Sequence, residues 1–317
     1  MDRRSLLRGA AVVGAAGVTG LAVPGAAHAA GPAGMPTYRY LRDALTLPLR
    51  YNPTGEFIFP CIRGVYDKVS GARSRYYLYY APHEKPGGIC VAWANSLNGP
   101  FTEHTGNPII DNVLPGGGTV SHVSSPHVTW DAATRQFFLY WHGENTTTRV
   151  ARSSDGINFR DETPILSTRL VPGLTETSYA RVFAHNGRYV MVYMGVLAGK
   201  RRIYHGWSPN GWDQWQFAQT PLVNPEPDGL TDISGPSLVF RNNTTYVAYH
   251  GNDGRMRLTE VGNALDRENH LGVFHSPAAT DNGRAAAPSF GTDGGVEYMF
   301  YEAGPRLNAR ICIARAV

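Results

Sequence analysis

Five aromatic-rich runs recur along the chain, and each leads into a turn: YYLYYAPH, FFLYWHGEN, YVMVYMG, YVAYHGND and YMFYEAG. Their anchor aromatics are Tyr80, Trp141, Tyr193, Tyr249 and Tyr301, with spacings of 61, 52, 56 and 52 residues. Self-similarity with a period of about fifty residues is typical of propellers and other repeat architectures. The repeat is therefore a stronger constraint on the fold than any single residue.

Each anchor run has the same neighbours. Upstream lies a short segment built around proline or a small residue: FIFPCIRG, VSSPHVTW, SYARVF, SGPSLVF and AAPSFG. Downstream lies a β-rich run: ICVAWANS, TRVARSSDG, RIYHGWSPNG, MRLTEV and RICIARAV. A fourth element ends in NPII (107–110), TPIL (163–166) or TPLV (220–223) in the first three units. We therefore predict an all-β fold, a five-bladed β-propeller with four-stranded antiparallel blades.

A β-sandwich is the alternative to the propeller. Its single strands recur every eight to twelve residues or so, but nothing in it makes four-strand units recur in register. The fifth unit ends on its third strand at Val317, and LTLPLRY (45–51) resembles the missing outer strand. We predict that this N-terminal segment completes the last blade and closes the ring, which removes an exposed sheet edge.

Residues 1–29 have the composition of an export signal. Arg3 and Arg4 precede Ser5-Leu6-Leu7, a small-residue apolar stretch follows, and Ala27-His28-Ala29 matches an A-x-A cleavage site. The paired arginines resemble a twin-arginine signal, although an ordinary secretory signal is the alternative. We predict a secreted protein whose residues 30–317 form one propeller domain. No later apolar stretch has the length needed to span a bilayer.

The net charge and the composition limit the kinds of partner that we expect the protein to bind. The formal net charge of the whole chain is +4, and removing the charged residues of the predicted signal lowers it to +2. No basic run or base-stacking motif accompanies it, so nucleic acid is not an expected partner. We expect a monomer that binds neutral or locally charged small molecules or polymers.

Three cysteines occur, at Cys61, Cys90 and Cys312. An odd number leaves at least one free thiol in a secreted protein. Cys90 and Cys312 share a register in the third strands of units one and five, but equivalent positions of neighbouring blades seldom allow disulfide geometry. We expect buried thiols.

Polar residues gather where first strands start and second strands end, and in a propeller these positions share one rim of the central channel. First-strand starts supply Glu56, His122, Glu176 and Asp232. Second-strand ends supply His83, His142, Glu144, Asn145, His250, Asn252, Asp253 and Glu302.

The residue after each anchor aromatic is Ala81, His142, Met194, His250 or Glu302. A structural role would favour one residue type in every blade, so this variation indicates a site shaped by function. The alternative is that each histidine caps a strand end by bonding to loop backbone.

Two strings on first strands are candidates for chemistry. In His122-Val-Ser-Ser-Pro-His127, both histidines reach the channel only if the proline bulges the strand. They would then act as acid and base, or ligate a single structural cation; no short spacing fixes a third ligand, so we expect no metal or other cofactor. In the second string, Arg181 follows Glu176 and needs an anionic partner, either a protein carboxylate or a substrate carboxylate.

The aromatic content suits sugars, because 17 tyrosines and 6 tryptophans offer flat faces and hydrogen-bonding groups. Register places Trp141, Tyr80 and Tyr179 near the rim. The predicted substrate-binding residues are His122, Trp141, His142, Glu144, Tyr179, Arg181, His250 and Glu302, and the predicted catalytic residues are Glu176, Asp232 and His127.

The repeat and the strand segments LNGPFTEHTGNPII and SSDGINFRDETPIL resemble the five-bladed propeller glycoside hydrolases, the broad group that contains families 43, 62, 32 and 117. The resemblance extends from about Tyr38 to Val317. It implies cleavage of glycosidic bonds in plant or microbial polysaccharides by acids from separate blades. Family 43 places acids beside prolines on the first strands, whereas this chain has Phe59-Pro60, Pro126-His127 and Ser234-Gly235-Pro236.

Three functions remain open from the sequence. In a hydrolase, two carboxylates among Glu176, Asp232 and Glu302 flank the scissile bond, and a histidine, His127 or His122, assists. In a polysaccharide lyase, His127 or Tyr179 abstracts a proton beside a uronate carboxylate that Arg181 neutralises. A non-catalytic carbohydrate-binding propeller explains the aromatics but not the clustered acids and histidines.

Overall fold

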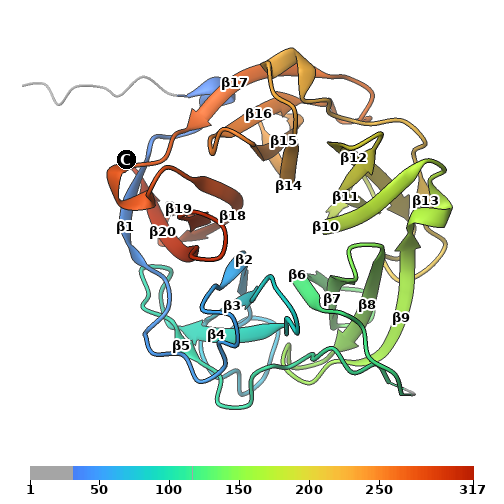
Figure 1. Ribbon diagram of the computed structural model, residues 1–317. Coiled ribbons are helices and arrows are strands. Elements are labelled where there is room, and N and C mark those ends of the chain that lie inside the picture. Colours follow the sequence, from blue (N-terminus) through green and yellow to red (C-terminus); the bar gives the residue numbers. More distant parts are fainter. Residues whose placement is uncertain (1–30, 116) are drawn as a thin grey trace, which may run out of the picture.

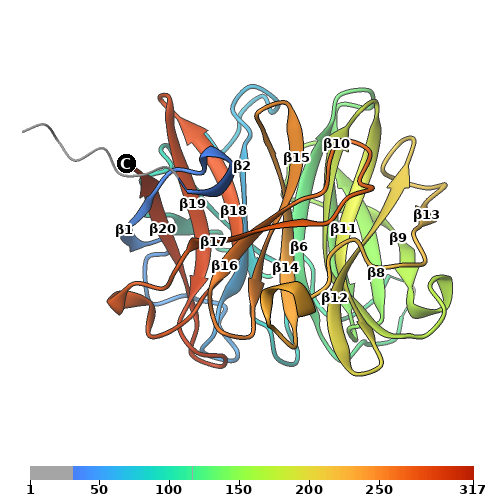
Figure 2. The same cartoon turned by 90° about the horizontal axis from the view of Figure 1, so that it is seen from above.

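A computed structural model describes residues 31–115 and 117–317 of the chain. The predicted signal segment, residues 1–29, lies outside the described residues. Five four-stranded antiparallel sheets stand around a central axis, with β2, β6, β10, β14 and β18 innermost (Figure 1). Figure 2 shows the same blades from the side. The predicted five-bladed β-propeller is confirmed.

Consecutive strands build each blade from the axis outward, and blade 5 takes its outermost strand from the N-terminal part of the chain. Blade 1 contains β2 (Ile58–Gly64), β3 (Tyr76–Ala81), β4 (Cys90–Ala94) and β5 (Thr102–Glu103), and blade 2 contains β6 (Val123–Asp131), β7 (Gln136–Gly143), β8 (Thr147–Ser153) and β9 (Arg160–Ser167). Blade 3 contains β10 (Leu174–His185), β11 (Arg188–Leu197), β12 (Lys200–Ser208) and β13 (Gln216–Phe217), and blade 4 contains β14 (Ile233–Arg241), β15 (Thr244–Gly251), β16 (Met256–Glu260) and β17 (Asn269–His275). Blade 5 contains β18 (Ala285–Asp293), β19 (Val296–Ala303), β20 (Arg310–Ala316) and β1 (Tyr38–Asp43).

The described helices are four single turns of 3₁₀ helix: η1 (Pro32–Gly34), η2 (Thr168–Leu170), η3 (Glu226–Asp228) and η4 (Ala279–Asp281). Within the described ranges, no helix is long and apolar enough to cross a membrane.

The predicted first three strands of each unit are confirmed, and the outer strands differ from expectation. The segment 163–166 lies in β9, but 107–110 and 220–223 form only isolated bridges: Ile110 pairs with Ile89, the residue before β4, and Val223 pairs with Ile203 of β12. The outer strands of blades 1 and 3 are instead two-residue strands a few residues upstream. Outer strands contact one neighbour, so their hydrophobic pattern is weak.

The outer strand of blade 5 is β1, which pairs antiparallel with β20 from Tyr38–Ala316 to Asp43–Cys312. The predicted position of that strand, residues 45–51, is wrong, because this segment forms only the Leu45–Phe101 bridge. Four of the six β1 residues are exposed, so its sequence lacks the alternation that marks a half-buried strand.

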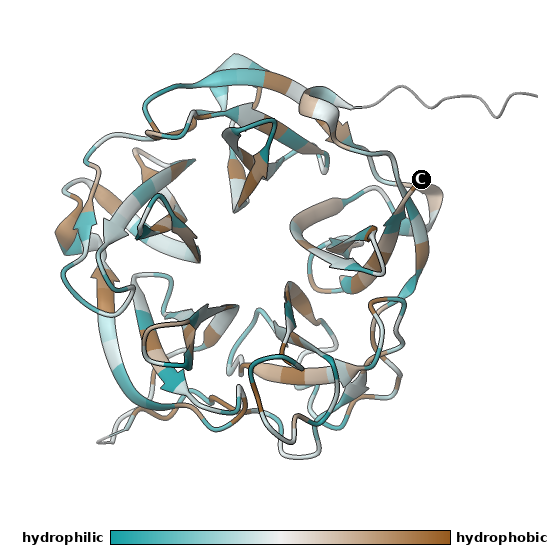
Figure 3. Ribbon diagram, turned by 180° about the vertical axis from the view of Figure 1, so that it is seen from behind, coloured by the Kyte–Doolittle hydropathy of each residue, from teal (hydrophilic) through white to brown (hydrophobic). Residues whose placement is uncertain are grey.

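Hydrophobic cores lie between neighbouring blades. One cluster joins Tyr80 of blade 1 to Phe300 of blade 5, and another joins Tyr193 of blade 3 to Tyr140 of blade 2. All five anchor aromatics are at most 1% exposed. Figure 3 shows hydrophobic residues within the blades and hydrophilic ones in many connecting loops. Trp141 belongs to the core between blades 1 and 2, so its predicted role in substrate binding is wrong.

The three cysteines are buried free thiols, as predicted. Cys61 Sγ accepts a hydrogen bond from the backbone N–H of Val128 at 3.2 Å, which ties blade 1 to blade 2.

A β-bulge with a left-handed residue interrupts each innermost strand at the same register. The five residues with positive φ are Phe59, Ser125, Tyr179, Gly235 and Ala287, with φ of 58°, 57°, 56°, 60° and 46°. Ladder pairing shifts at each of these positions. A β-bulge changes the direction in which the neighbouring side chains point. In this ring the bulges turn the side chains at the repeated positions toward the channel.

Arg181 is buried in the middle of the ring, beside the bulges. Its guanidinium donates to the backbone oxygens of Pro60 at 3.3 Å, Ala287 at 3.2 Å and Pro288. The side chain starts in blade 3 and its acceptors lie in blades 1 and 5, so it spans the ring. Its partners are backbone carbonyls, and its predicted role in substrate binding is wrong because the residue is only 5% exposed beneath the rim.

We expect Arg181→Met to lower the free energy of unfolding by about 2–4 kcal/mol, because three buried carbonyls lose a charged donor. Urea unfolding followed by tryptophan fluorescence measures the change. Arg160→Met is the control, since the Arg160 side chain is 70% exposed and its loss is expected to cost no more than about 0.5 kcal/mol. If Arg181→Met lowers the free energy of unfolding no more than Arg160→Met does, Arg181 does not have this structural role.

Candidate functional site

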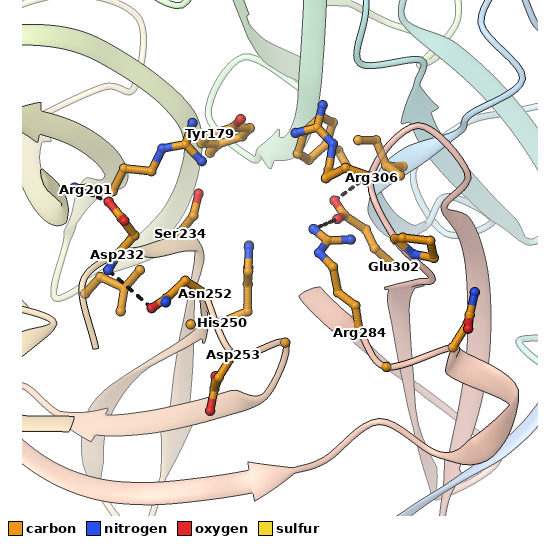
Figure 4. A pocket seen from close by; sticks show the side chains of 18 residues that line it. Tyr179, Arg201, Asp232, Ser234, His250, Asn252, Asp253, Arg284, Glu302 and Arg306 are labelled. Atoms are coloured by element: carbon orange, nitrogen blue, oxygen red, sulfur yellow. Dashed lines mark hydrogen bonds and ion pairs between the residues drawn. The ribbon is translucent and has the colours of Figure 1, made fainter. Parts of the chain in front are cut away.

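One cavity of about 460 Å³ opens on the rim of the channel (Figure 4). Blades 3, 4 and 5 supply most of its wall, and Ile58 and Phe59 of blade 1 complete it. Its polar lining comprises Tyr179, Arg201, Asp232, Ser234, His250, Asn252, Asp253, Asn282, Arg284, Glu302 and Arg306. A concave site with a few convergent polar groups is the usual form of a small-molecule site.

The structure brings together four of the predicted site residues in this cavity: Asp232, His250, Glu302 and Tyr179. Asp232 precedes the bulge of blade 4 by three residues, and Arg284 has the same place in blade 5. Glu56, His122 and Glu176 are the equivalents in the other blades. The first-strand positions thus share a rim as expected, but only those of blades 4 and 5 line this cavity.

Glu302 is fully buried at the end of β19. Its Oε1 accepts a hydrogen bond from Phe59 N–H at 3.1 Å, and its Oε2 accepts one from Arg284 Nη2 at 2.7 Å. Burial alone would raise the pKa of Glu302, but the Arg284 guanidinium and these hydrogen bonds hold it below its usual range. Glu302 is therefore a carboxylate at neutral pH.

His250 points into the cavity from the end of β15 (Figure 4). Ala287 N–H donates to its Nδ1 at 3.4 Å, so the neutral ring carries its proton on Nε2. Burial, aided by the Arg284 charge, lowers the pKa of His250 to about 3. The ring therefore offers a neutral N–H donor to a ligand.

The residues after the anchor aromatics share a structural task. His142 Nδ1 accepts from Tyr179 N–H at 3.4 Å, as His250 does from Ala287 and Glu302 does from Phe59. In each case the donor is the left-handed bulge residue of the next blade. His142 and His250 thus bond to backbone, as the alternative of strand caps has it, but their donors lie in the bulges of β10 and β18 and not in loops. His250 and Glu302 also line the cavity.

Asp232 lies opposite Glu302 in the cavity (Figure 4). Its Oδ1 accepts from Arg201 N–H at 2.9 Å, and its Oδ2 accepts from Thr231 Oγ1 at 3.1 Å. Both contacts come from adjoining loops, which fix the carboxylate at the rim.

Tyr179 forms part of the wall between the cavity and a cluster of histidines. Its Oη is 3.2 Å from His83 Nε2, and the rings of His142 and Phe59 lie 5.4 Å and 5.1 Å from its ring. His122 joins the cluster, with its ring 5.5 Å from that of His142. His122 and His142 do not line the cavity but stand beside it.

Other predicted residues lie away from the cavity. His127 is 1% exposed, and its Nε2 is 2.9 Å from the backbone oxygen of Val182, so its predicted catalytic role is wrong. The bulge at Ser125 lies between His122 and His127 and leaves His127 facing the interior. Glu144 lies in a turn and pairs with Arg149 at 3.6 Å, while Glu176 at the start of β10 is half-buried; neither lines the cavity.

The arginines of the cavity were not predicted. Arg284 holds the first-strand position that Asp232 holds in blade 4, so the repeat could have identified it. Arg201 and Arg306 come from a hairpin and a loop, and the run Lys200-Arg201-Arg202 is the sequence signal for the first of these. In the described ranges, no group of three or more histidine, cysteine, aspartate or glutamate residues has the arrangement needed to hold a metal ion.

No family model matches the sequence, and no curated protein matches it significantly. Solved structures do share its fold. The α-L-arabinofuranosidase of Podospora anserina, solved with cellotriose, is 10% identical over 89% of this chain and 97% of its own, with a TM-score of 0.61. A family 43 β-xylosidase/α-arabinofuranosidase from a compost microbial metagenome, solved with xylotriose, is 15% identical over 89% and 95%, with a TM-score of 0.61.

The family 32 β-fructofuranosidase of Bombyx mori is 15% identical over 87% of this chain and 61% of its own, with a TM-score of 0.60. The chain thus has the fold of the five-bladed propeller glycoside hydrolases, as the sequence resemblance predicts. At these identities the likeness extends to the fold alone.

The depressed pKa of His250 predicts an acid-sensitive fold. The unfolded chain binds a proton at this residue near pH 6.5 and the folded protein does so only near pH 3, so stability is lost as pH falls through this window. His250→Asn keeps an acceptor for Ala287 N–H but does not titrate. We expect the slope of unfolding free energy against pH, measured by urea unfolding between about pH 5 and 4, to become shallower by up to about 1.4 kcal/mol per unit. Equal slopes in the two proteins would show that His250 is not held neutral.

Proposed function

We propose that this protein is a secreted carbohydrate-active enzyme, a glycoside hydrolase that acts on a plant or microbial polysaccharide or oligosaccharide at the rim cavity. The observation that carries the proposal is the pair of carboxylates, Asp232 and Glu302, that line one cavity from adjacent blades, Glu302 buried in its wall (Figure 4). Two carboxyl groups that flank a sugar are the usual requirement for glycoside hydrolysis. The arabinofuranosidase, xylosidase and fructofuranosidase of like fold support the same class of substrate.

The two carboxylates differ in their surroundings, which suggests a division of roles. Glu302 is held ionised by Arg284 and can activate water or attack the anomeric carbon. Asp232 is then the group that protonates the leaving oxygen. Water adds across the glycosidic bond, so that the hydroxyl joins the anomeric carbon and the proton joins the departing sugar.

This catalytic pair differs from the family 43 arrangement. The positions where that family places acids hold Phe59, His127 and Ser234. Phe59 packs against Tyr179 and His127 is buried away from the cavity, so neither replaces an acid. In this proposal the catalytic carboxylates belong to blades 4 and 5.

A polysaccharide lyase is the second candidate, because Tyr179 Oη lies 3.2 Å from His83 Nε2 on the cavity wall. Burial raises the pKa of Tyr179, while the charges of Arg201 and Arg306 act in the opposite direction. Tyr179 would remove the proton beside a uronate carboxylate, and the glycosidic oxygen would leave as a double bond forms. His83 and Arg201 replace His127 and Arg181 in this mechanism.

Export and oligomeric state belong to the same proposal. The twin-arginine-like signal at residues 1–29 would send the mature chain out of the cytoplasm, where polysaccharide is found, and the ring would act as a monomer. Neither nucleic acid nor a membrane is proposed as a partner, and no cofactor is required by either mechanism.

We expect Glu302→Gln and Asp232→Asn each to reduce glycan cleavage by about a hundredfold or more, because each removes a carboxylate but keeps its backbone hydrogen bond. Release of reducing ends from a panel of plant and microbial polysaccharides measures cleavage. Glu226→Gln is the matched control, since Glu226 pairs with Lys200 outside the cavity. Full activity in both cavity variants would refute the assignment.

The lyase alternative predicts a different product. Elimination yields a conjugated double bond that absorbs in the ultraviolet, and Tyr179→Phe should abolish it because the phenol oxygen is the base. Hydrolysis yields reducing ends without that absorbance. If Tyr179→Phe leaves turnover of an acidic glycan unchanged, the lyase alternative fails.

A further inference from the structure

Most charges that line the rim cavity are already paired. Arg284 bonds to Glu302, and Asp253 accepts two hydrogen bonds of 2.8 Å from the Arg257 guanidinium. Arg306 lies 2.9 Å from Glu84. In these pairs a protein carboxylate neutralises the charge of each arginine, so Arg284 and Arg306 offer little of it to an anionic ligand.

Among the cations of the cavity Arg201 is the exception, and among its carboxylates Asp232 likewise makes no ion pair in the described ranges. The backbone N–H of Arg201 bonds to Asp232, but within the described parts of the chain its guanidinium makes no hydrogen bond or ion pair. The side chain extends into the cavity beside Tyr179, on the opposite side from Arg284 and Arg306 (Figure 4). A guanidinium carries five N–H donors in a planar fork, and in Arg201 those donors are open to whatever occupies the cavity.

We infer that the cavity binds an acidic sugar, a uronate, whose carboxylate pairs with Arg201. This inference rests on the proposed function and specifies its substrate class. The flat guanidinium matches a flat carboxylate through two parallel hydrogen bonds. A dianionic phosphate fits less well, because it would face both Asp232 and Glu302 with one unpaired cation to balance it.

The remaining open groups suit the neutral part of such a sugar. His250 presents Nε2–H, and Asn252 uses its Oδ1 to accept from Thr231 N–H at 3.3 Å, which leaves its amide N–H groups for the ligand. Ser234 adds a hydroxyl on the same wall. With one open cation, neutral donors around it and the Asp232 carboxylate nearby, the cavity favours a singly charged sugar over a highly charged one.

The test compares oligogalacturonides and oligoglucuronides with their methyl esters, which keep the shape and remove the charge. Calorimetry on the full mature protein measures binding separately from turnover. We expect the acids to bind about tenfold tighter or more than the esters, and this ratio to fall to about one in Arg201→Gln. Arg201→Lys, which keeps the charge without the fork, should retain part of the preference.

Arg202→Gln is the matched control. Arg202 is the next residue on the same strand, but its guanidinium bonds to Asn224 and Glu226 and does not line the cavity. It should leave the ratio of acid to ester binding unchanged. A preference that survives in Arg201→Gln, or that Arg202→Gln abolishes equally, overturns the role of Arg201.

The remaining outcomes separate this inference from the proposed function. Equal binding of acids and esters, binding of sulfated sugars alone, or no binding of any uronate at millimolar concentration overturns the inference, even if a neutral glycan is hydrolysed. Arg201-dependent binding of uronates without cleavage of any glycan supports the inference and refutes the enzyme.

Discussion

The structure depends on the packing of each blade against its two neighbours. A four-stranded sheet has two faces to bury, and the cores lie between successive blades, so no blade can be completed alone. The buried anchor aromatics fill these spaces at one register in every unit. Because five such interfaces must close on themselves, blade 5 meets blade 1, and the residues at the rim are fixed in mutual position although they are far apart in sequence.

The rim is built by a second repeat, the left-handed bulge of each innermost strand. Three of the five blade junctions satisfy the bulge N–H with a side chain, from His142, His250 or Glu302, while Ala81 and Met194 stand at the other two positions and have no acceptor. The same side chains that order the bulges therefore supply polar groups to the rim. At His250 and Glu302 the side chain that bonds to the bulge also lines the rim cavity.

The fold could be predicted from sequence because its signal is periodic, whereas the site depends on contacts between blades that no period describes. Repeated aromatic runs indicate three strands in every unit, but an exposed outer strand such as β1 carries no alternation, and its position could not be inferred. Asp232 and Glu302 were accessible to reasoning because each occupies a repeat position at a strand end. His127 shows the limit: the bulge that was expected to turn His127 toward the channel is present at Ser125, but His127 is buried against the backbone of Val182, because the sequence does not indicate how far a bulge turns the residues after it.

Two arginines show how burial decides what one side chain can do. Arg181 is enclosed beside the bulges, where an unpaired guanidinium would be costly, and the backbone carbonyls of two other blades accept its hydrogen bonds. The N–H donors of Arg181 bond to the backbone of the fold, and burial lowers the pKa of Arg181 to about 10. Arg201 lies on the open side of the same bulges, where water can solvate an unpaired charge at little cost. Of these two arginines, only Arg201 can therefore offer its charge to a ligand, because the Arg181 guanidinium is buried and bonded to backbone carbonyls.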